Sequence, residues 1–519
     1  MRLYLLCLFL GLYASSCDFS YFDEMPAYTY NPEWIIPLIN SSVVIHDFIL
    51  ELDSTLYYID DENFVTLIYQ TGLIDLSGGE TFQLPEQFYS IIFEFAGWSN
   101  GNKVLEGSHP FFFDVDWMQR TDSLTFLAGS VEVHLDSPDL LNNGFSYSAA
   151  VLFPELYDSQ GNPVEIGLEV NEVAHIALAD HTMLFYEDDP AHSLFDVHYA
   201  VEVYGEGDPD NLPYDMDLSI SFADMEFKTI LGSVKPRTLA YEEGEMDIDI
   251  FSTYKDGGIY FEQPEIKLDA KTSFGFDIHM LMHNLYGQRN DETVALEGFP
   301  YPWQAPAVPT ENLGEINQVG FSLHPDNSNL SDFIQLYPDE LHYDVAAVLV
   351  PEDDKSSGFI SYDSNFSMDV ALWLPLEMRI VKYVLGDTLS FPIAEDLGDI
   401  DWLEFKIDIK NGLPLSSELQ IYFLDESDNV LMHLFDDVSH SRIIDAAPVN
   451  EDGIVTGMNN FLKYVYIDQE RLNQINAAEN MVFSVRLQTS NAGDIPVKIF
   501  SDYQMDIFVG LKAALYIEL

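Results

Sequence analysis

The sequence predicts an all-β protein built from tandem antiparallel β-sandwich domains of the immunoglobulin-like kind, with few short helices. Apolar residues alternate with polar ones along much of the chain, which places one face of each strand in a core and the other in water. Turn-forming residues separate the alternating segments. Aromatic residues favour pleated, half-buried surfaces and make up 14% of the chain, which supports the same fold class. A hydrophobic fraction of 47% excludes global disorder.

The alternating segments occur from the first quarter of the chain to its end. They are Leu124–Leu135, Met246–Ile250, Phe274–Met280, Phe366–Leu374, Leu403–Ile409 and Met505–Leu511. Turn-type residues predict hairpin connections at Asp158–Pro163, Lys255–Gly258 and Asp425–Asn429. Helices are expected only at His46–Leu56 and Asp468–Ala478, where apolar residues recur three or four positions apart.

A chain of 519 residues is long enough for several domains. A stretch rich in proline, which stiffens a chain, suggests one internal boundary after residue 300. The expected segments are a signal peptide (1–16), a lipid-attached tether (17–45), a β-sandwich region (46–210), an immunoglobulin-like β domain (211–300), a Pro-rich connector (301–310) and a C-terminal β-sandwich region (311–519).

The first residues have the pattern of an export signal. Arg2 precedes an apolar run that is too short to span a bilayer, for which about 20 residues are needed. Ala14, Ser15 and Ser16 then lead to Cys17, which resembles the lipobox of bacterial lipoproteins, although the lipobox usually has Leu where Ala14 stands. An ordinary secretory cleavage site fits as well. Both interpretations place the cut before Cys17, so both predict export.

The cysteine count favours acylation of Cys17. The chain has two cysteines, and Cys7 would leave with the signal peptide. A lone cysteine in an exported chain cannot form an internal disulfide, and a lipid on the mature N-terminus would explain it. We therefore expect a protein attached to the outer membrane through this lipid. Acidic residues soon after Cys17 resemble the surface-export signal of Bacteroidota lipoproteins and favour exposure at the cell surface.

Charge restricts the possible partners. The chain has 88 Asp and Glu against 21 Lys and Arg, a formal net charge of −67. Such a protein repels phosphate backbones, so nucleic acid is excluded as a partner. Adaptation to salt is the simplest explanation of the acidity, and capture of divalent cations or cationic partners is the alternative. No cofactor is expected, apart from an adventitious Ca²⁺ between loops.

The order of several segments resembles uncharacterised envelope lipoproteins of Bacteroidota. The matching pieces are Asn31–Leu38, Ile259–Ile266 with Thr272–Gly275, and Lys498–Tyr503. The middle piece is also similar to the late-embryogenesis-abundant type 2 fold, an immunoglobulin-like sandwich. The resemblance implies an envelope location and carries no established activity.

The search for chemistry finds weak candidates. His279 and His283 lie on a predicted strand, about 13 Å apart by strand rise, too far for one metal ion. His175 and His181 lack a third ligand at a recognisable spacing. The acidic groups Glu187–Asp189, Glu352–Asp354 and Asp436–Asp437 fit solvated turns, and Asp425–Asn429 fails the pattern of an EF-hand calcium loop.

Catalytic motifs for esterases, phosphate binding and dinucleotides are absent from the sequence. Five tryptophans would stack on sugars if exposed, but their apolar surroundings favour core packing: Trp98, Trp117, Trp303, Trp373 and Trp402. We therefore expect a non-enzymatic envelope lipoprotein with a binding or structural role at the cell surface. The protein or glycan partner stays open. The alternatives are a secreted carbohydrate-active hydrolase or carbohydrate-binding protein, and a lipid-binding β protein.

The charge imbalance predicts a response to salt. Repulsion among the acidic side chains is stronger in the folded state, and salt shortens its range from about 30 Å at 0.01 M to about 3 Å at 1 M. We expect the thermal midpoint to rise over this range of NaCl. A flat or falling midpoint would show that the acidity does not destabilise the fold. An equal further response to CaCl₂ and MgCl₂ at constant ionic strength would argue against a selective calcium site.

Overall fold

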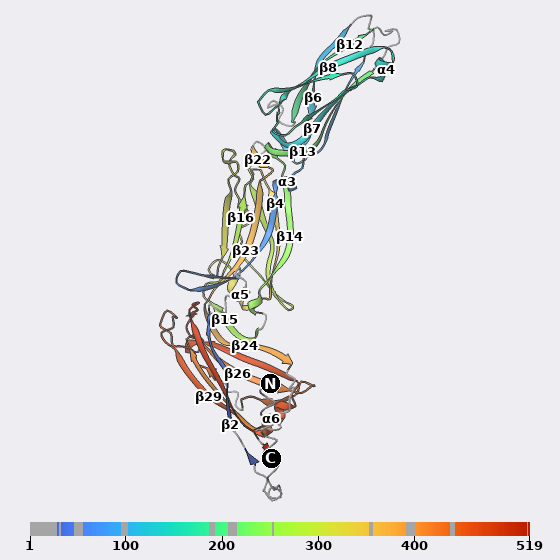
Figure 1. Cartoon of the computed structure of the whole chain (residues 1–519). Coiled ribbons are helices and arrows are strands. Elements are labelled where there is room, and N and C mark those ends of the chain that lie inside the picture. Colours follow the sequence, from blue (N-terminus) through green and yellow to red (C-terminus); the bar gives the residue numbers. More distant parts are fainter. Residues whose placement is uncertain are drawn as a thin grey trace, which may run out of the picture. The chain divides into compact units, whose positions relative to one another are not determined.

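The structure is a computed structural model. It describes residues 29–30, 33–45, 56–94, 102–185, 193–205, 215–251, 254–351, 357–390, 400–435, 442–515 and 517–518. Antiparallel strands make up most of this chain, so the predicted all-β class is confirmed (Figure 1). The chain divides into two compact units. Unit 1 comprises 1–67, 250–263 and 374–519, and unit 2 comprises 68–249 and 264–373.

Unit 2 contains a ten-stranded antiparallel sheet. Its main path runs β22-β13-β7-β11-β8-β12-β6, with β5 on β13, β10 on β7 and β9 on β8. The strands are β5 (Gln87–Glu94), β6 (Lys103–Phe112), β7 (Met118–Asp136), β8 (Phe145–Tyr157), β9 (Pro163–Glu169), β10 (Val173–Ala177), β11 (Thr182–Leu184), β12 (Leu194–Gly205), β13 (Asp215–Val234) and β22 (Gly358–Ser361).

Two five-stranded sheets follow. The first, β14-β21-β17-β18 with β19 on β17, consists of β14 (Arg237–Asp247), β17 (Ile278–Arg289), β18 (Glu292–Ala295), β19 (Trp303–Ala305) and β21 (Glu340–Leu349). The second, β20-β16-β23-β4-β3, consists of β3 (Tyr57–Ile59), β4 (Val65–Ser77), β16 (Glu265–Thr272), β20 (Asn317–Leu323) and β23 (Asn365–Pro375). Three short helices belong to unit 2: α3 (Gly78–Thr81), α4 (Pro138–Asn142) and α5 (Leu330–Gln335).

Unit 1 contains a seven-stranded and a four-stranded sheet. The larger, β15-β24-β30-β26-β27 with β28 on β26 and β31 on β24, consists of β15 (Tyr254–Phe261), β24 (Glu377–Ser390), β26 (Leu415–Leu424), β27 (Val430–His433), β28 (Arg442–Ile444), β30 (Asn480–Thr489) and β31 (Val497–Lys498). The smaller, β2-β32-β25-β29, consists of β2 (Glu33–Val44), β25 (Ile400–Asn411), β29 (Asn459–Ile467) and β32 (Gln504–Leu515). The pair β1 (Thr29–Tyr30) and β33 (Ile517–Glu518) is separate.

The core of unit 1 explains the one helix predicted near the C-terminus. Helix α6 (Gln469–Asn476) begins at Asp468, whose side chain accepts a hydrogen bond from the Arg471 amide and caps the helix. Leu472 and Ile475 of α6 pack with residues of both sheets, and together they form one apolar cluster: Phe423, Met432, Ile467, Leu472, Ile475 and Ala478, flanked by Leu403 and Phe405. The prediction of a helix at Asp468–Ala478 is confirmed, and the helix covers one end of a sandwich.

The strand and turn predictions are confirmed at most positions. In β23, Phe366, Met368 and Val370 are buried in alternation with more exposed residues, as predicted. Hairpin turns join β8 to β9 and β26 to β27 at the expected places. The helix predicted for His46–Leu56 lies almost entirely outside the described residues.

Three details differ from the prediction. In the predicted strand Met246–Ile250, β14 ends at Asp247 and a 3-10 helix follows at Asp249–Phe251. Lys255–Gly258 is no hairpin turn, because it lies inside β15, where the pairing with β24 shifts register. Gly257 has a φ of 99°, and a Cβ there would lie 2.0 Å from the Lys382 carbonyl oxygen, so glycine serves a β-bulge. Phe274 and Phe276 are buried as expected, but the strand begins only at Ile278.

Aromatic side chains form the core of the ten-stranded sheet. Phe222 of β13 is fully buried, and its ring centroid lies 5.9 Å from that of Phe113, 6.0 Å from Phe195 and 6.3 Å from Phe153. All three contacts are edge-on, the arrangement that aromatic quadrupoles prefer. Phe222 therefore holds together rings from several parts of this sheet.

Replacement of Phe222 tests this core. We expect Phe222→Ala to lower the free energy of unfolding by about 3–5 kcal/mol, because a large buried ring is replaced by a cavity. Urea unfolding followed by near-ultraviolet circular dichroism measures the loss. Phe88→Ala is the matched control, since Phe88 lies on β5 and is 71% exposed. Equal effects of the two changes would contradict the assignment of Phe222 to the core.

Candidate functional site

The outer side of the four-stranded sheet β2-β32-β25-β29 presents aromatic and charged side chains together. In β25, Leu403 and Phe405 point to the core, so Trp402, Glu404 and Lys406 point outward. The strand registers place outward residues of three strands side by side. We call this surface the aromatic face; it comprises Trp402, Glu404, Lys406, Asp408 and Lys410 of β25, Asn460, Leu462, Tyr464 and Tyr466 of β29, and Asp506, Phe508 and Lys512 of β32.

Three apolar side chains of the aromatic face are exposed, whereas Trp402 and Phe508 are half-buried. Leu462, Tyr464 and Tyr466 are 55%, 54% and 52% exposed. The ring centroids of Trp402 and Tyr466 are 5.6 Å apart with an angle of 34° between the planes, so the two rings are in contact. Exposed apolar residues that are grouped, rather than scattered, mark interaction sites.

Lysines lie among these rings. Lys512 Nζ is 5.1 Å from the Trp402 ring centroid, and Lys406 Nζ is 5.6 Å from that of Phe508. Lys406 also lies 3.4 Å from Asp408. Ammonium groups at these distances are attracted by the negative faces of aromatic rings. Three of the 21 cationic residues of the chain are thus on one sheet face.

A polar groove of about 400 Å³ opens at one end of the aromatic face. Ser42 donates a hydrogen bond of 2.8 Å to the Asp506 carboxylate there. The groove is lined by Asn40, Ser41, Ser42, Asp408, Lys410, Asp506, Ile507 and Phe508. The face therefore combines flat rings with hydrogen-bond donors and acceptors, as small-molecule sites commonly do.

The other tryptophans considered in the sequence are not among the residues of the aromatic face. Trp117 is buried, with its ring 4.7 Å from that of Phe82, which agrees with the core packing expected from sequence. Trp303 and Trp373 are half-buried, and Lys267 Nζ lies only 3.5 Å from the Trp373 ring centroid. Trp98 lies outside the described residues. Trp402 is half-buried as well, and among the four described candidates it is the one in ring contact with an exposed tyrosine, Tyr466.

A second groove, of about 390 Å³, contains a pair of carboxylates. Asp269 of β16 and Asp369 of β23 face each other in register. Glycines clear the space beside both: a Cβ atom at Gly320 would lie 2.9 Å from Asp269 Oδ1, and one at Gly72 would lie 3.6 Å from Asp369 Oδ1. We call this the carboxylate groove; Lys267, Lys271, Gln318 and Trp373 also line it.

The carboxylate groove shifts the titration of Asp369. Burial raises the pKa of Asp369; Lys271 lowers it, and the charges of Asp269 and Asp75 raise it again, so the net shift is upward. Asp369 therefore keeps its proton more readily than an ordinary aspartate, as a general acid must. Lys267, however, covers the ring of Trp373, the only tryptophan in the groove.

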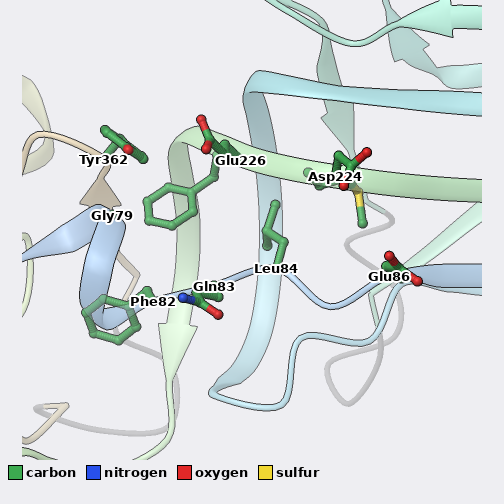
Figure 2. A pocket seen from close by; sticks show the side chains of 10 residues that line it. Gly79, Phe82, Gln83, Leu84, Glu86, Asp224, Glu226 and Tyr362 are labelled. Atoms are coloured by element: carbon green, nitrogen blue, oxygen red, sulfur yellow. The ribbon is translucent and has the colours of Figure 1, made fainter.

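A third pocket, of about 370 Å³, has an apolar floor and an acidic rim. Figure 2 shows Phe82, Leu84 and Gln83 on the segment after α3, with Asp224 and Glu226 on β13. Glu86 completes a rim of three carboxylates. Such a rim favours a ligand with a cationic group and disfavours the carboxylate of a fatty acid.

The predicted histidine pairs do not meet at one site. His279 and His283 both lie on β17, as expected, and a register shift separates them. His175 lies 2.9 Å from Glu132 on the neighbouring strand. His181 has the carbonyl oxygen of Ala179 3.1 Å from Nδ1. Within the described ranges, none of the four belongs to a group with the spacing of metal ligands.

A different histidine does lie in such a group. His342 Nε2 is 2.9 Å from Glu340 Oε2, and His342 Nδ1 is 3.7 Å from Glu245 Oε2. The imidazole stacks on Tyr286, with centroids 4.9 Å apart. Two carboxylates and an imidazole are ligands for Zn²⁺ or Mn²⁺. The hydrogen bond to Glu340 and the stacking on Tyr286 already explain the position of His342, so the geometry gives no separate support for a metal ion. In the sequence, only Glu340, two residues before His342, points to this group. Glu245 comes near His342 through strand pairing alone, so the third ligand could not be predicted.

The proposed acidic loops give no calcium site in the described chain. In the Asp425–Asn429 turn, the Asp425 carboxylate accepts hydrogen bonds from the amides of Ser427 and Asn429. The Asn429 bonds hold the pKa of Asp425 below its ordinary value. This carboxylate thus closes a turn. Glu187–Asp189, Glu352–Asp354 and Asp436–Asp437 lie outside the described residues, as does Cys17, so the lipid attachment stays a prediction.

Comparison with known proteins identifies no relatives by sequence. No protein-family model and no curated protein matches the chain. A solved chain from Parabacteroides distasonis ATCC 8503, assigned as a secreted protein, is 15% identical over 56% of this chain and 90% of its own, with a TM-score of 0.26.

Viral β proteins are also similar in structure. A triple-jelly-roll structure from an archaeal virus is 9% identical over 80% of this chain and 89% of its own, with a TM-score of 0.12. The VP2 subviral particle of infectious bursal disease virus is 11% identical over 90% of this chain and 82% of its own, with a TM-score of 0.12. TM-scores this low carry no argument about function. Among the described residues, no helix is long and apolar enough to cross a membrane.

Asp369→Asn tests the electrostatics of the carboxylate groove. A raised pKa means that folding disfavours the ionised form, so Asp369 destabilises the fold above its folded pKa and not below its ordinary pKa of 3.8. We expect the variant to melt at a higher temperature than the wild type at pH 7, and the difference to vanish toward pH 3. Asp363→Asn, at an exposed turn, is the control. A lower melting temperature at pH 7 would show that attraction to Lys271 dominates.

Proposed function

We propose that this chain is an exported envelope protein, held by a lipid on Cys17, that binds a ligand outside the cell without transforming it. The observation that carries the proposal is the aromatic face. Its rings and polar groups are fixed on paired strands, so little ordering is needed on binding. The proposal supplies a binding surface for the envelope role expected from the sequence.

Rigid placement distinguishes this surface from ordinary exposed residues. Both Trp402 and Tyr466 lie on strands whose opposite faces contribute to the core of unit 1. The backbone under the rings is therefore held by the same pairing that holds the core. Aromatic anchors on a rigid base are the usual sources of binding free energy.

A glycan-cleaving activity is the second candidate function. Its supporting observation is the pair Asp269 and Asp369, because glycoside hydrolysis requires two nearby carboxyl groups, and burial raises the pKa of Asp369. Lys267 weighs against it, because its Nζ lies 3.5 Å from the Trp373 ring centroid and a sugar would have to displace it. On the aromatic face, Lys512 Nζ lies farther from its ring, 5.1 Å from the Trp402 centroid. Measurement of reducing ends released from glycans by the wild type and by Asp369→Asn decides between cleavage and binding alone.

The binding proposal is tested by a screen of ligand classes. The full protein, purified from membranes in detergent, is titrated with soluble glycans, peptides and dispersed lipids, and heat is measured by calorimetry. We expect one class to bind, to be recovered chemically unchanged and to lose binding in Trp402→Ala/Tyr466→Ala. Failure of every class, or release of a cleaved product, would overturn the proposal.

Lipid attachment has its own test. We expect Cys17→Ser to prevent incorporation of a labelled fatty acid and to move the protein from the membrane fraction to the soluble one, because acyl chains provide the anchor. Cys7→Ser is the matched control, since this cysteine would leave with the signal peptide. If both variants are labelled, or if neither variant nor the wild type is labelled, the lipoprotein assignment is wrong.

A further inference from the structure

We infer that the ligand of the aromatic face is an extended neutral glycan. The inference rests on the proposed binding function and adds the chemical class of the ligand. A pyranose ring has a flat side of C–H groups and a rim of hydroxyl groups. A matching protein surface needs flat aromatic rings with donors and acceptors beside them, and both are on this face.

The apolar part of the match is the Trp402–Tyr466 pair. The two rings are in contact, with centroids 5.6 Å apart and planes tilted by 34°, and Tyr466 is 52% exposed. Tyr464 lies two residues before Tyr466 on the same side of β29 and is 54% exposed. Rings with polar atoms at their edges suit a ligand that is apolar on one side and polar at its rim.

The polar part of the match continues along the strands. Lys406 and Asp408 follow Trp402 on the same outer side of β25, and Asp408 also lines the polar groove. Lysine donates hydrogen bonds and aspartate accepts them. A hydroxyl group both donates and accepts, so it can use either neighbour.

The length of the face selects an oligosaccharide over a single sugar. Register pairing arranges the outward residues in four rows: Glu404 with Tyr466 and Lys512, Lys406 with Tyr464, Asp408 with Leu462 and Phe508, and Lys410 with Asn460 and Asp506. Rows two residues apart are separated by about 6.6 Å, so the four rows extend over roughly 20 Å. Several linked sugar units are needed to cover this length.

The charge of the face selects a neutral ligand. Three lysines (Lys406, Lys410, Lys512) balance three carboxylates (Glu404, Asp408, Asp506), although the whole chain has a formal charge of −67. A polyanion such as a polyuronate would be repelled by the whole molecule on approach. A polycation would be attracted to many other surfaces and would not prefer this one. An uncharged chain with many hydroxyl groups fits the local balance.

A panel of neutral linear hexasaccharides tests the inference. Cellohexaose, xylohexaose, mannohexaose and maltohexaose are titrated against the full protein in detergent, and binding is measured by calorimetry. We expect at least one to bind, to bind more tightly than its own disaccharide, and to bind at least about tenfold more weakly in Trp402→Ala/Tyr466→Ala, since aromatic anchors dominate such losses. Tyr58→Ala/Tyr301→Ala, which removes two exposed tyrosines elsewhere, should bind as the wild type does.

A second variant covers the case in which the double variant does not fold. Tyr464→Ala removes one exposed ring, and circular dichroism of each variant reports folding. We expect this change to weaken binding of the hexasaccharide without a change in the melting temperature. Unaltered binding in Tyr464→Ala and in the folded double variant would overturn the assignment to this face.

The outcomes separate the inference from the proposed function. If no hexasaccharide binds but a peptide or lipid does, and Trp402→Ala/Tyr466→Ala abolishes that binding, the glycan inference is wrong and the binding function stands. If polygalacturonate binds as tightly as the neutral sugars do, the inference that the ligand is neutral is wrong. If no ligand class binds, both proposals fail.

Discussion

Pairing of β25 with β29 and β32 is the constraint on which unit 1 depends. Side chains alternate along a strand, so one register directs Leu403 and Phe405 to the core and Trp402 and Lys406 to solvent. A slip of one residue would exchange the two sets. The burial of the apolar set therefore also holds the rings of the aromatic face in place. Stability and the proposed binding surface come from the same alternation.

Several of the few cationic side chains lie over aromatic rings. Lys512, Lys406 and Lys267 lie over aromatic rings, and so does Lys463, which lies 4.3 Å from the Phe435 ring centroid. Burial lowers the pKa of Lys463. In a chain where acidic groups outnumber basic ones about fourfold, ring faces compete with carboxylates for the few ammonium groups. The aromatic face can thus be locally neutral on a strongly negative protein.

The sequence allowed the individual elements to be predicted better than their partners. Strict alternation in Phe366–Leu374 and the three-residue spacing of Leu472 and Ile475 are local signals, and the structure confirms both. Lys255–Gly258 was misinterpreted because glycine serves a bulge as readily as a turn. The aromatic face was beyond prediction. Trp402 meets Tyr466 only through strand pairing between segments far apart in the chain, and His342 meets Glu245 in the same way.

The path of the chain through unit 1 has a consequence for how the protein reaches its folded state. Unit 1 is assembled from 1–67, 250–263 and 374–519, and β2, near the beginning, pairs with β32, near the end. Contacts between such distant segments must wait for closure of very long loops, which slows folding. The four-stranded sheet cannot be completed until β32 is available to pair with β2 and β25. Until then β2 and one edge of β25 have no partner in this sheet, so wrong strand pairing competes with folding.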